Sequence, residues 1–181
     1  ATNNAQGFRV TPAPIGAALA GTPLLVVGDS IAHGDELADG ETWAALLQAK
    51  LGRRTINAAV SGYGLDQIVL RAERLVPELK PDTIVLGFIP DDIRRAELSQ
   101  RDNHPKPYFV LSEEPPDRLT LRGVPVPPRT DPRRTLTLVQ RVFGYSYLVD
   151  FVLRRLGLME DWFGDHVRVH PTGTGEEIGC R

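Results

Sequence analysis

The 181-residue sequence contains a single cysteine, Cys180, which excludes an intrachain disulfide. One cysteine fits a reducing compartment and equally an extracytoplasmic protein without disulfides, so the compartment stays open. No apolar run approaches the roughly 20 residues that a membrane span needs, and the first residues lack the charged and apolar regions of a secretion signal. The net charge is only −2. Neither a nucleic-acid footprint nor a polybasic membrane patch is therefore expected.

The first half of the sequence alternates short apolar runs with longer segments of helical periodicity. The runs are 24–27, 55–60 and 83–89, and the helical segments are 42–51 and 65–79. Continuous apolar runs of this length predict strands that are buried on both faces. Their alternation with helices predicts an α/β fold with a parallel sheet and right-handed crossovers. The small, polar residues 1–22 are expected to form a lead-in.

The second half has a different composition. Eight of the 15 prolines fall in residues 93–134, which we interpret as a surface excursion from the sheet. Residues 135–158 have helical periodicity, with a kink or split expected at Gly144. Short apolar pieces within the excursion predict small hairpin strands at 108–111, 119–121 and 124–126.

The C-terminal residues predict a helix start. Thr174 and Glu177 match a capping box, in which a threonine caps the helix and a glutamate follows three residues later. A helix of so few residues does not support itself, and a polar tail is the alternative interpretation. Three strands also make a thin sheet for this architecture. Together these features predict that the domain continues beyond the C-terminal end of the sequence.

Candidate functional residues follow each of the three predicted strands. They are Gly28-Asp29-Ser30, Ser61-Gly62 and Gly87 to Asp92. Sites in open α/β sheets form at the carboxyl ends of the strands, and these loops converge if the first strand lies between the other two. Serine is a weak nucleophile that needs an adjacent base. Ser30 follows the first predicted strand and Gly28, so its hydroxyl group can lie at the mouth of the sheet. This position makes it a candidate nucleophile, with helix capping as the alternative role.

Three segments resemble, in order, the sequence blocks of the SGNH/GDSL hydrolases. They are Val27 to Ile31, Asn57 to Gly64 and Gly87 to Asp92, and the resemblance extends over residues 7–99. The wider sequence resembles a branch that handles polysaccharide O-acetyl groups. The resemblance implies a three-layer, flavodoxin-like α/β sandwich with about five parallel strands when complete. It also implies one domain over residues 1–181, with the last block outside the chain.

The resemblance assigns a role to each block. Ser30 would attack an ester carbonyl, and the amides of Ser30 and Gly62 would donate to the oxyanion. Each such donor is worth about 10²–10³ in rate. The base would be a histidine in an Asp-x-x-His block. The implied activity is that of a serine esterase or O-acyl transferase acting on small-molecule or O-acetylated carbohydrate esters. No cofactor or metal is implied, and an extracytoplasmic location is compatible with the resemblance.

The sequence departs from the family pattern at the third block, where Asp91 occupies the place of an oxyanion-binding asparagine. An ionised aspartate has no hydrogen to donate. A carboxylate about 3 Å from the oxyanion would repel it by roughly 5 kcal/mol at an effective dielectric constant of about 20. Asp91 is therefore either protonated, turned away from the oxyanion, or damaging to activity.

A second departure concerns the base, because the 181 residues contain no Asp-x-x-His. His33 is expected on the surface or at the rim of the site, and His104 lies in the proline-rich excursion. His166 and His170 lack the expected spacing from an aspartate. A block outside the chain is the preferred explanation.

Other functions fit the sequence less well. The serine lacks a Gly-x-Ser-x-Gly context, and there is neither a P-loop nor a complete dinucleotide fingerprint. Asp29, His33, Asp91 and Asp92 could in principle hold a metal, although their spacing matches no defined motif. Arg94 and Arg95 are expected on a solvated face. The rival functions are a non-catalytic domain that binds a glycan or a protein partner and a small nucleotide- or flavin-binding domain.

Overall fold

The computed structural model describes residues 1–16, 18–101, 104–111, 119–128, 138–143, 146–158, 167–169 and 177–179. They fall into two compact units, Ala1–Ala96 and Glu97–Arg181.

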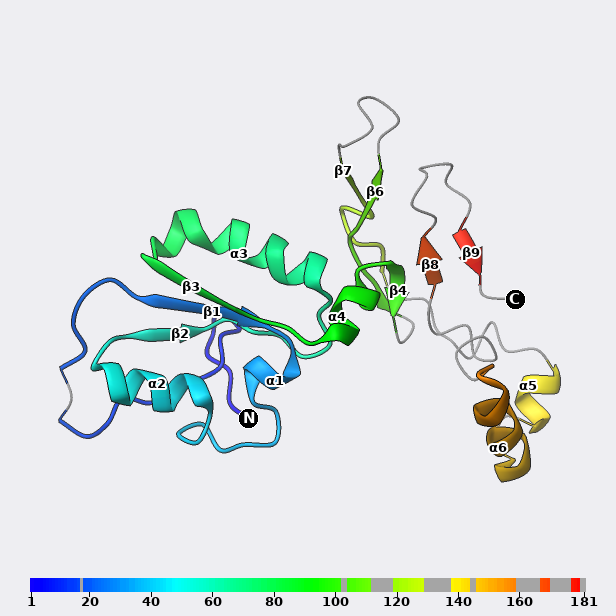
Figure 1. Cartoon of the computed structure of the whole chain (residues 1–181), viewed down its shortest axis with the longest axis horizontal. Coiled ribbons are helices and arrows are strands. Elements are labelled where there is room, and N and C mark those ends of the chain that lie inside the picture. Colours follow the sequence, from blue (N-terminus) through cyan, green and yellow to red (C-terminus); the bar gives the residue numbers. More distant parts are fainter. Residues whose placement is uncertain are drawn as a thin grey trace. The chain divides into compact units, whose positions relative to one another are not determined.

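The first unit is built on a three-stranded parallel sheet (Figure 1). Its strands are β1 (Leu24–Gly28), β2 (Thr55–Asn57) and β3 (Thr83–Gly87). Its helices are α1 (Ser30–His33), α2 (Trp43–Leu51), α3 (Leu65–Leu79) and α4 (Pro90–Arg95). The strand order is β2-β1-β3. This confirms the α/β class and the condition under which the three loops converge, since β1 lies between the other two strands.

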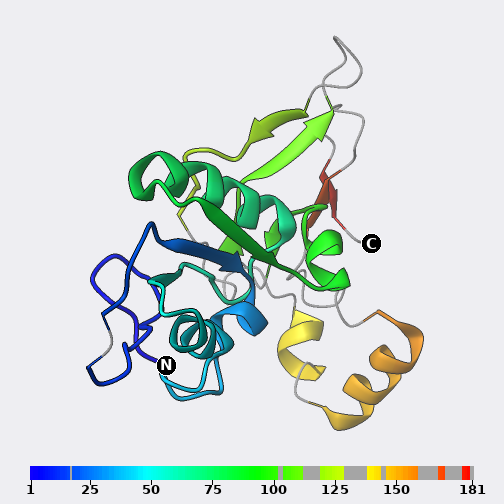
Figure 2. The ribbon, with the colours of Figure 1, turned by 60° about the vertical axis from the view of Figure 1, so that its left-hand side comes forward.

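Helices cover both faces of β1, with α3 on one side of the sheet and α2 on the other (Figure 2). Leu25 and Val27 belong to a buried cluster with Ile68 of α3. Leu24 and Val26 alternate with them and join a second cluster on the opposite face. That second cluster includes Ala32 of α1 and Ala44 of α2, and the partly buried Trp43 and Leu47 of α2 pack against it. The prediction that β1 is buried on both faces is therefore confirmed.

Local sequence signals fix the helix ends. Thr42 caps α2 by accepting a hydrogen bond from Ala45 N at 3.2 Å, and Gly52 ends the helix with φ of +60°. Helix α3 has the predicted bounds, and Lys80, which has φ of +47°, follows it as the C-cap.

The N-terminal segment is more than a lead-in. Phe8 is buried in the cluster beneath α3, and Arg9 N donates to Asn57 O of β2 at 2.9 Å. Gln48 of α2 donates to the carbonyl oxygens of Thr11 and Pro12, and its Oε1 accepts from Thr55 N at 2.9 Å. The lead-in prediction was wrong for these residues, since an isolated Phe-Arg pair in a polar stretch gave no periodic signal.

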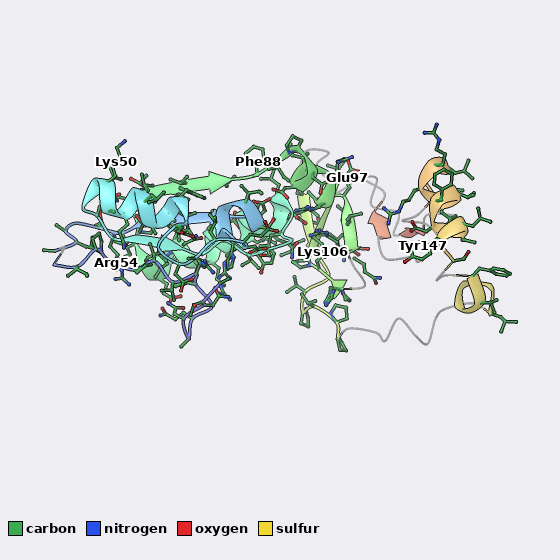
Figure 3. The ribbon with its side chains drawn as sticks, turned by 90° about the horizontal axis from the view of Figure 1, so that it is seen from below. Lys50, Arg54, Phe88, Glu97, Lys106 and Tyr147 are labelled. Atoms are coloured by element: carbon green, nitrogen blue, oxygen red, sulfur yellow. The ribbon has the colours of Figure 1, made fainter. Side chains whose placement is uncertain are left out.

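Strand β3 differs from its prediction in length and burial. The strand stops at Gly87, and Ile84 and Leu86 are 45% and 37% exposed. Phe88, which follows the strand, is also half exposed (Figure 3). The expectation of a third strand buried on both faces was therefore wrong. Among the described residues, β3 pairs only with β1 and forms one edge of its sheet.

The described residues of the second unit form two small antiparallel sheets and two helices. One sheet has the order β5-β4-β8-β9, built from His104–Pro105, Leu98–Arg101, Val167–Val169 and Glu177–Gly179. The other is the hairpin of β6 (Tyr108–Leu111) and β7 (Leu119–Arg122), with Tyr108 opposite Arg122. The helices are α5 (Leu138–Phe143) and α6 (Tyr147–Leu156).

Several predictions for the second half have clear outcomes. The first two hairpin strands are confirmed, whereas residues 124–126 form no strand. The helical segment is divided between Phe143 and Ser146, although Gly144 itself lies outside the described residues. Residues 170–176, where a capping box was expected, also lie outside them, and Glu177 begins a strand instead of a helix. The interpretation of the whole chain as one domain with a surface excursion stays a prediction.

Within the described part of the chain, no helix has the length and apolar character needed to cross a membrane. Helix α6 instead exposes large side chains, and Tyr147 at its start is 92% exposed (Figure 3).

Candidate active site

The three candidate loops meet at the carboxyl edge of the parallel sheet. Gly28 and Gly87 are paired in register at the ends of β1 and β3. Val60 N donates to Gly28 O at 2.9 Å and so fixes the loop after β2 beside the loop after β1. Arg95 Nη1 donates to Tyr63 O at 3.4 Å and links α4 to the same loop. Parallel pairing and these two contacts bring Ser30, Gly62 and Asp91 to one edge, as predicted.

Ser30 is the first residue of α1 and does not cap it. The cap is Asp29, whose Oδ1 accepts from Ile31 N at 3.0 Å and from Ala32 N at 3.3 Å. The capping interpretation of Ser30 was therefore wrong, and its half-buried side chain is left for another role. In the described part of the chain, no donor reaches the second Asp29 oxygen, although Asp29 is 1% exposed.

Glycine at position 28 allows α1 to start directly against β3. A Cβ on Gly28 would overlap Ala32 Cβ and lie 2.5 Å from Gly87 O. A backbone oxygen at that distance cannot move aside without disturbing the sheet. The glycine before Asp29 therefore has a packing reason that is independent of any chemistry at Ser30.

Gly62 lies in a tight turn that begins at Val60. Tyr63 N donates to Val60 O at 3.3 Å and closes the turn, and Gly62 has φ of +82°. A positive φ at the third turn position is the mark of a type II turn and favours glycine there. The turn thus fixes the direction of the Gly62 amide, which the sequence blocks assign to the oxyanion.

The Asp91 carboxylate contacts two arginines of its own helix. Oδ1 lies 2.8 Å from Arg94 Nη2, and Oδ2 lies 2.7 Å from Arg95 Nη2. Arg94 is exposed as predicted, but Arg95 is largely covered, so the expectation of a solvated face fails for Arg95. Arg95 is covered because its guanidinium also bonds Asp92 and Tyr63 O.

Asp92 is fully buried beside the Ser30 loop. Its Oδ2 accepts from Ile89 N at 2.9 Å, and its Oδ1 lies 2.6 Å from Arg95 Nη1. Burial raises the pKa of the Asp92 carboxyl group, the hydrogen bond from Ile89 opposes this shift, and the negative charge of Asp29 adds to it. The buried acidic side chains of Asp29 and Asp92 are therefore near enough for the charge of Asp29 to act on Asp92.

His33, Asp35 and Ser61 form a connected cluster. His33 Nδ1 donates to Asp35 Oδ1 at 2.6 Å, and its Nε2 lies 3.2 Å from Asn3 Oδ1. Ser61 Oγ lies 2.6 Å from each Asp35 oxygen. Of the two positions expected for His33, the surface was wrong, because the residue is 7% exposed and its ring contacts Asn3 and Asp35. A place at the rim of the site stays a prediction.

The three remaining histidines lie outside the first unit, which carries Ser30. His104 lies in β5, within the second unit. His166 and His170 lie outside the described residues. In the described part of the chain, no three histidine, cysteine or acidic side chains are grouped so as to hold a metal ion.

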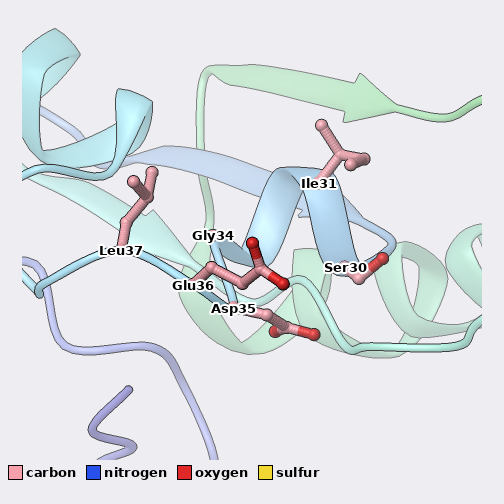
Figure 4. Close-up of a pocket in the computed structure, with 6 residues that line it drawn as sticks. All are labelled: Ser30, Ile31, Gly34, Asp35, Glu36 and Leu37. Carbon is pink, nitrogen blue, oxygen red and sulfur yellow. The ribbon is translucent and has the colours of Figure 1, made fainter.

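A pocket of about 430 Å³ opens beside Ser30. It is lined by α1 and the loop that follows it, through Ser30, Ile31, Gly34, Asp35, Glu36 and Leu37. Figure 4 shows the carboxyl groups of Asp35 and Glu36 directed to the side on which Ser30 lies. A pocket with two apolar and two acidic walls accommodates a small neutral group better than an anionic one.

The sequence analysis missed three side chains of this edge. Asp35 gave no signal, because its partner Ser61 lies 26 residues away. Arg95 looked like an ordinary surface arginine. Asn57 Nδ2 donates to Ala32 O at 3.0 Å and so joins β2 to α1, which no spacing rule predicts. Only the contact of Asp92 with the start of α4 had a usable sequence signal, since a carboxylate at the third helical position commonly reaches back to the helix start.

Comparison with known proteins identifies the family. The model of the GDSL-like lipase/acylhydrolase family matches residues 26–107, which include all three loops. The chain is 30% identical over 146 residues to the esterase TesA of Pseudomonas aeruginosa, with 74% of this chain and 72% of that protein covered. A crystal structure of TesA aligns at 35% identity with a TM-score of 0.38, over 41% of this chain and 44% of that chain. The chain therefore belongs to the GDSL-like lipase/acylhydrolase family.

Proposed function

We propose that this chain is a serine esterase or acyl transferase in which Ser30 is the nucleophile. The observation that carries the proposal is the placement of Ser30 at the start of α1, directly after buried β1. The turn that holds Gly62 is hydrogen-bonded to the same strand end. Family membership and the name of the esterase relative support an ester substrate.

In this proposal the amides of Ser30 and Gly62 donate to the oxyanion. Preorganised backbone donors suit this role because they need no rearrangement as the charge develops. Asp91 occupies the position of the oxyanion-binding asparagine in the third block but does not donate a hydrogen bond to the oxyanion. Its carboxylate, held by Arg94 and Arg95, has no hydrogen to offer.

The proposed base is a histidine of an Asp-x-x-His block, a pattern that the 181 residues do not contain. The proposed substrates are small-molecule esters or O-acetylated carbohydrates. The pocket beside Ser30 suits the latter, because Asp35 and Glu36 can accept hydrogen bonds from sugar hydroxyl groups.

The test compares wild type with Ser30→Ala and Asp91→Asn in hydrolysis of an aryl acetate and of an acetylated oligosaccharide. Ser30→Ala should lower kcat/KM by at least about 10³-fold, because the nucleophile is lost. Asp91→Asn should preserve or raise turnover, since asparagine donates where aspartate cannot. A fluorophosphonate probe should label wild type and leave Ser30→Ala unlabelled.

Equal turnover in wild type and Ser30→Ala would overturn the assignment of the nucleophile. A large loss in Asp91→Asn would show that the carboxylate has a role of its own. Absence of both turnover and labelling in a protein that includes an Asp-x-x-His block would favour the second candidate, a non-catalytic domain that binds a glycan or a partner at the same edge. The ion pairs of Asp91 with Arg94 and Arg95 favour that candidate, because they occupy the position of an oxyanion donor.

A further inference from the structure

We propose that Arg9 is a positioning residue that holds the Leu37 wall of the pocket beside Ser30 and thereby limits the size of the group that the pocket accepts. The meaning of the pocket for an ester rests on the function proposed above, whereas the contact itself does not. The Arg9 Nη2 atom donates to Leu37 O at 2.7 Å and lies 3.0 Å from Asp39 Oδ1. Leu37 lines the pocket, on the loop that follows α1 (Figure 4).

Arg9 is itself anchored to the parallel sheet. Its amide donates to Asn57 O of β2 at 2.9 Å, and Asn3 pairs with it on its own segment as an isolated antiparallel bridge. The Arg9 side chain is fully buried. Its guanidinium group therefore attaches the Leu37 carbonyl to the sheet itself.

The loop between α1 and α2 has further contacts. Two backbone hydrogen bonds join loop residues to one another, and Asp35 binds Ser61 of the turn after β2. These contacts shape the loop and attach its start. Arg9 attaches its middle, at Leu37 and Asp39, which is the part that carries the apolar wall of the pocket.

The surroundings of Arg9 suit a positioning role better than a purely stabilising one. In the described part of the chain, its Nε and Nη1 atoms are buried without a partner. Such incomplete pairing of a buried charge is costly, and an apolar side chain of similar volume is often at least as stabilising. The Asp39 side chain is 26% exposed, so water can solvate it when Arg9 is replaced. Arg9→Met should therefore release the loop without unfolding the protein.

Release of the loop would widen the pocket at its apolar side. Ile31 and Leu37 are the large apolar side chains of the pocket, and Leu37 is 43% exposed. Packing alone therefore does not fix Leu37, and its position depends on the main chain that carries it. Hydrogen bonds from charged donors are stronger than neutral ones, so we expect loss of this contact to raise local opening of the loop about ten-fold.

The experiment compares Arg9→Met, Arg9→Lys and a control, Arg53→Met, with wild type in the full chain. Arg53 is matched to Arg9, because its guanidinium also donates to a carbonyl oxygen, that of Thr22, and pairs with an aspartate, Asp82. It precedes β2, at the amino ends of the strands and away from Ser30. Amide hydrogen exchange followed by NMR reports on the loop, and thermal unfolding reports on overall stability. Binding of aliphatic alcohols from ethanol to hexanol, followed by amide chemical shifts, reports on the size limit of the pocket.

We expect exchange at Leu37 and Glu41 to accelerate about ten-fold in Arg9→Met, while Val26 of β1 keeps its wild-type rate. The affinity for hexanol relative to ethanol should rise about ten-fold, since the released wall admits and buries the longer chain. Arg9→Lys should fall between wild type and Arg9→Met, because an ammonium group lacks the planar fork of a guanidinium. Arg53→Met should match wild type in both measurements. In hydrolysis of aryl esters, the preference for longer chains should appear in KM and not in kcat.

Wild-type exchange in the loop of Arg9→Met, or equal acceleration in the loop and in β1, would overturn the proposal. Faster exchange in the loop with an unchanged preference among the alcohols would overturn the role of Arg9 in setting the pocket size. If Arg9→Met does not fold, Arg9→Lys decides the question by the same measurements. Failure of the esterase proposal would be seen as absence of turnover in a protein that includes an Asp-x-x-His block. Exchange and alcohol binding need no reaction and test the contact in either case.

Discussion

Strands β1 and β3 lie side by side, paired at five positions, and each is a largely apolar pentapeptide that ends in glycine. All five residues of β1 are buried, whereas no residue of β3 is. The difference lies in their neighbours. Strand β1 has a strand on each side and helices over both faces, while β3 pairs with β1 alone among the described residues. The comparison teaches that burial of a strand depends on what packs around it as much as on its own side chains.

The largest effect should come from matched leucine truncations in the two strands. Leu25→Ala should lower the free energy of unfolding by about 2–5 kcal/mol, because a fully buried side chain leaves a cavity. Leu86→Ala should cost about 1 kcal/mol or less, since Leu86 is already partly exposed. Urea denaturation followed by tryptophan fluorescence measures both. Equal costs would mean that β3 is covered in solution.

A smaller effect should distinguish the two strand ends. Gly28→Ala should cost about 1–3 kcal/mol, because the new Cβ meets a backbone oxygen that cannot yield. Gly87→Ala should cost less, since its Cβ would lie 3.2 Å from the Ala32 methyl group, which can shift slightly. The comparison is made by the midpoints of thermal unfolding. A lower midpoint for Gly87→Ala than for Gly28→Ala would contradict the packing described for α1.

The smallest effect concerns the pH dependence of stability at the end of β3. Burial raises the pKa of Asp92, so the folded state holds its proton at pH values where the unfolded state has released it. Wild type should therefore lose stability as the pH rises from about 4 through the folded-state pKa. Asp92→Asn lacks this titration.

The measurement for Asp92 is urea denaturation of wild type and Asp92→Asn between pH 4 and pH 7. The stability of wild type minus that of the variant should decrease as the pH rises across this range. A difference that increases with pH would mean that the ion pair with Arg95 outweighs burial.

Much of the first unit could be predicted from the sequence. The apolar run at Leu24 and the periodicity from Leu65 to Leu79 gave β1 and the bounds of α3, because those signals are local. Convergence of the three loops followed from the strand order. The exposure of β3 could not be predicted, since its residues are as apolar as those of β1.

The site was predictable only in part, for a related reason. Sequence blocks placed Ser30, Gly62 and Asp91 at one edge, and their chemical roles stay predictions. The cluster of His33, Asp35 and Ser61 joins two loops, and burial of His33 needs Asn3 from the start of the chain. Contacts between residues so far apart in sequence depend on the folded loops and leave no periodic pattern.

The two outer edges of the parallel sheet have different consequences for growth of that sheet. Along β2, the Thr55 amide is occupied by Gln48 and the Asn57 carbonyl by Arg9. Strand β3 carries no comparable cover within the residues described for the first unit. Extension of the sheet is therefore directional: an added strand, whichever polypeptide supplies it, finds free main-chain groups beside β3 and blocked ones beside β2.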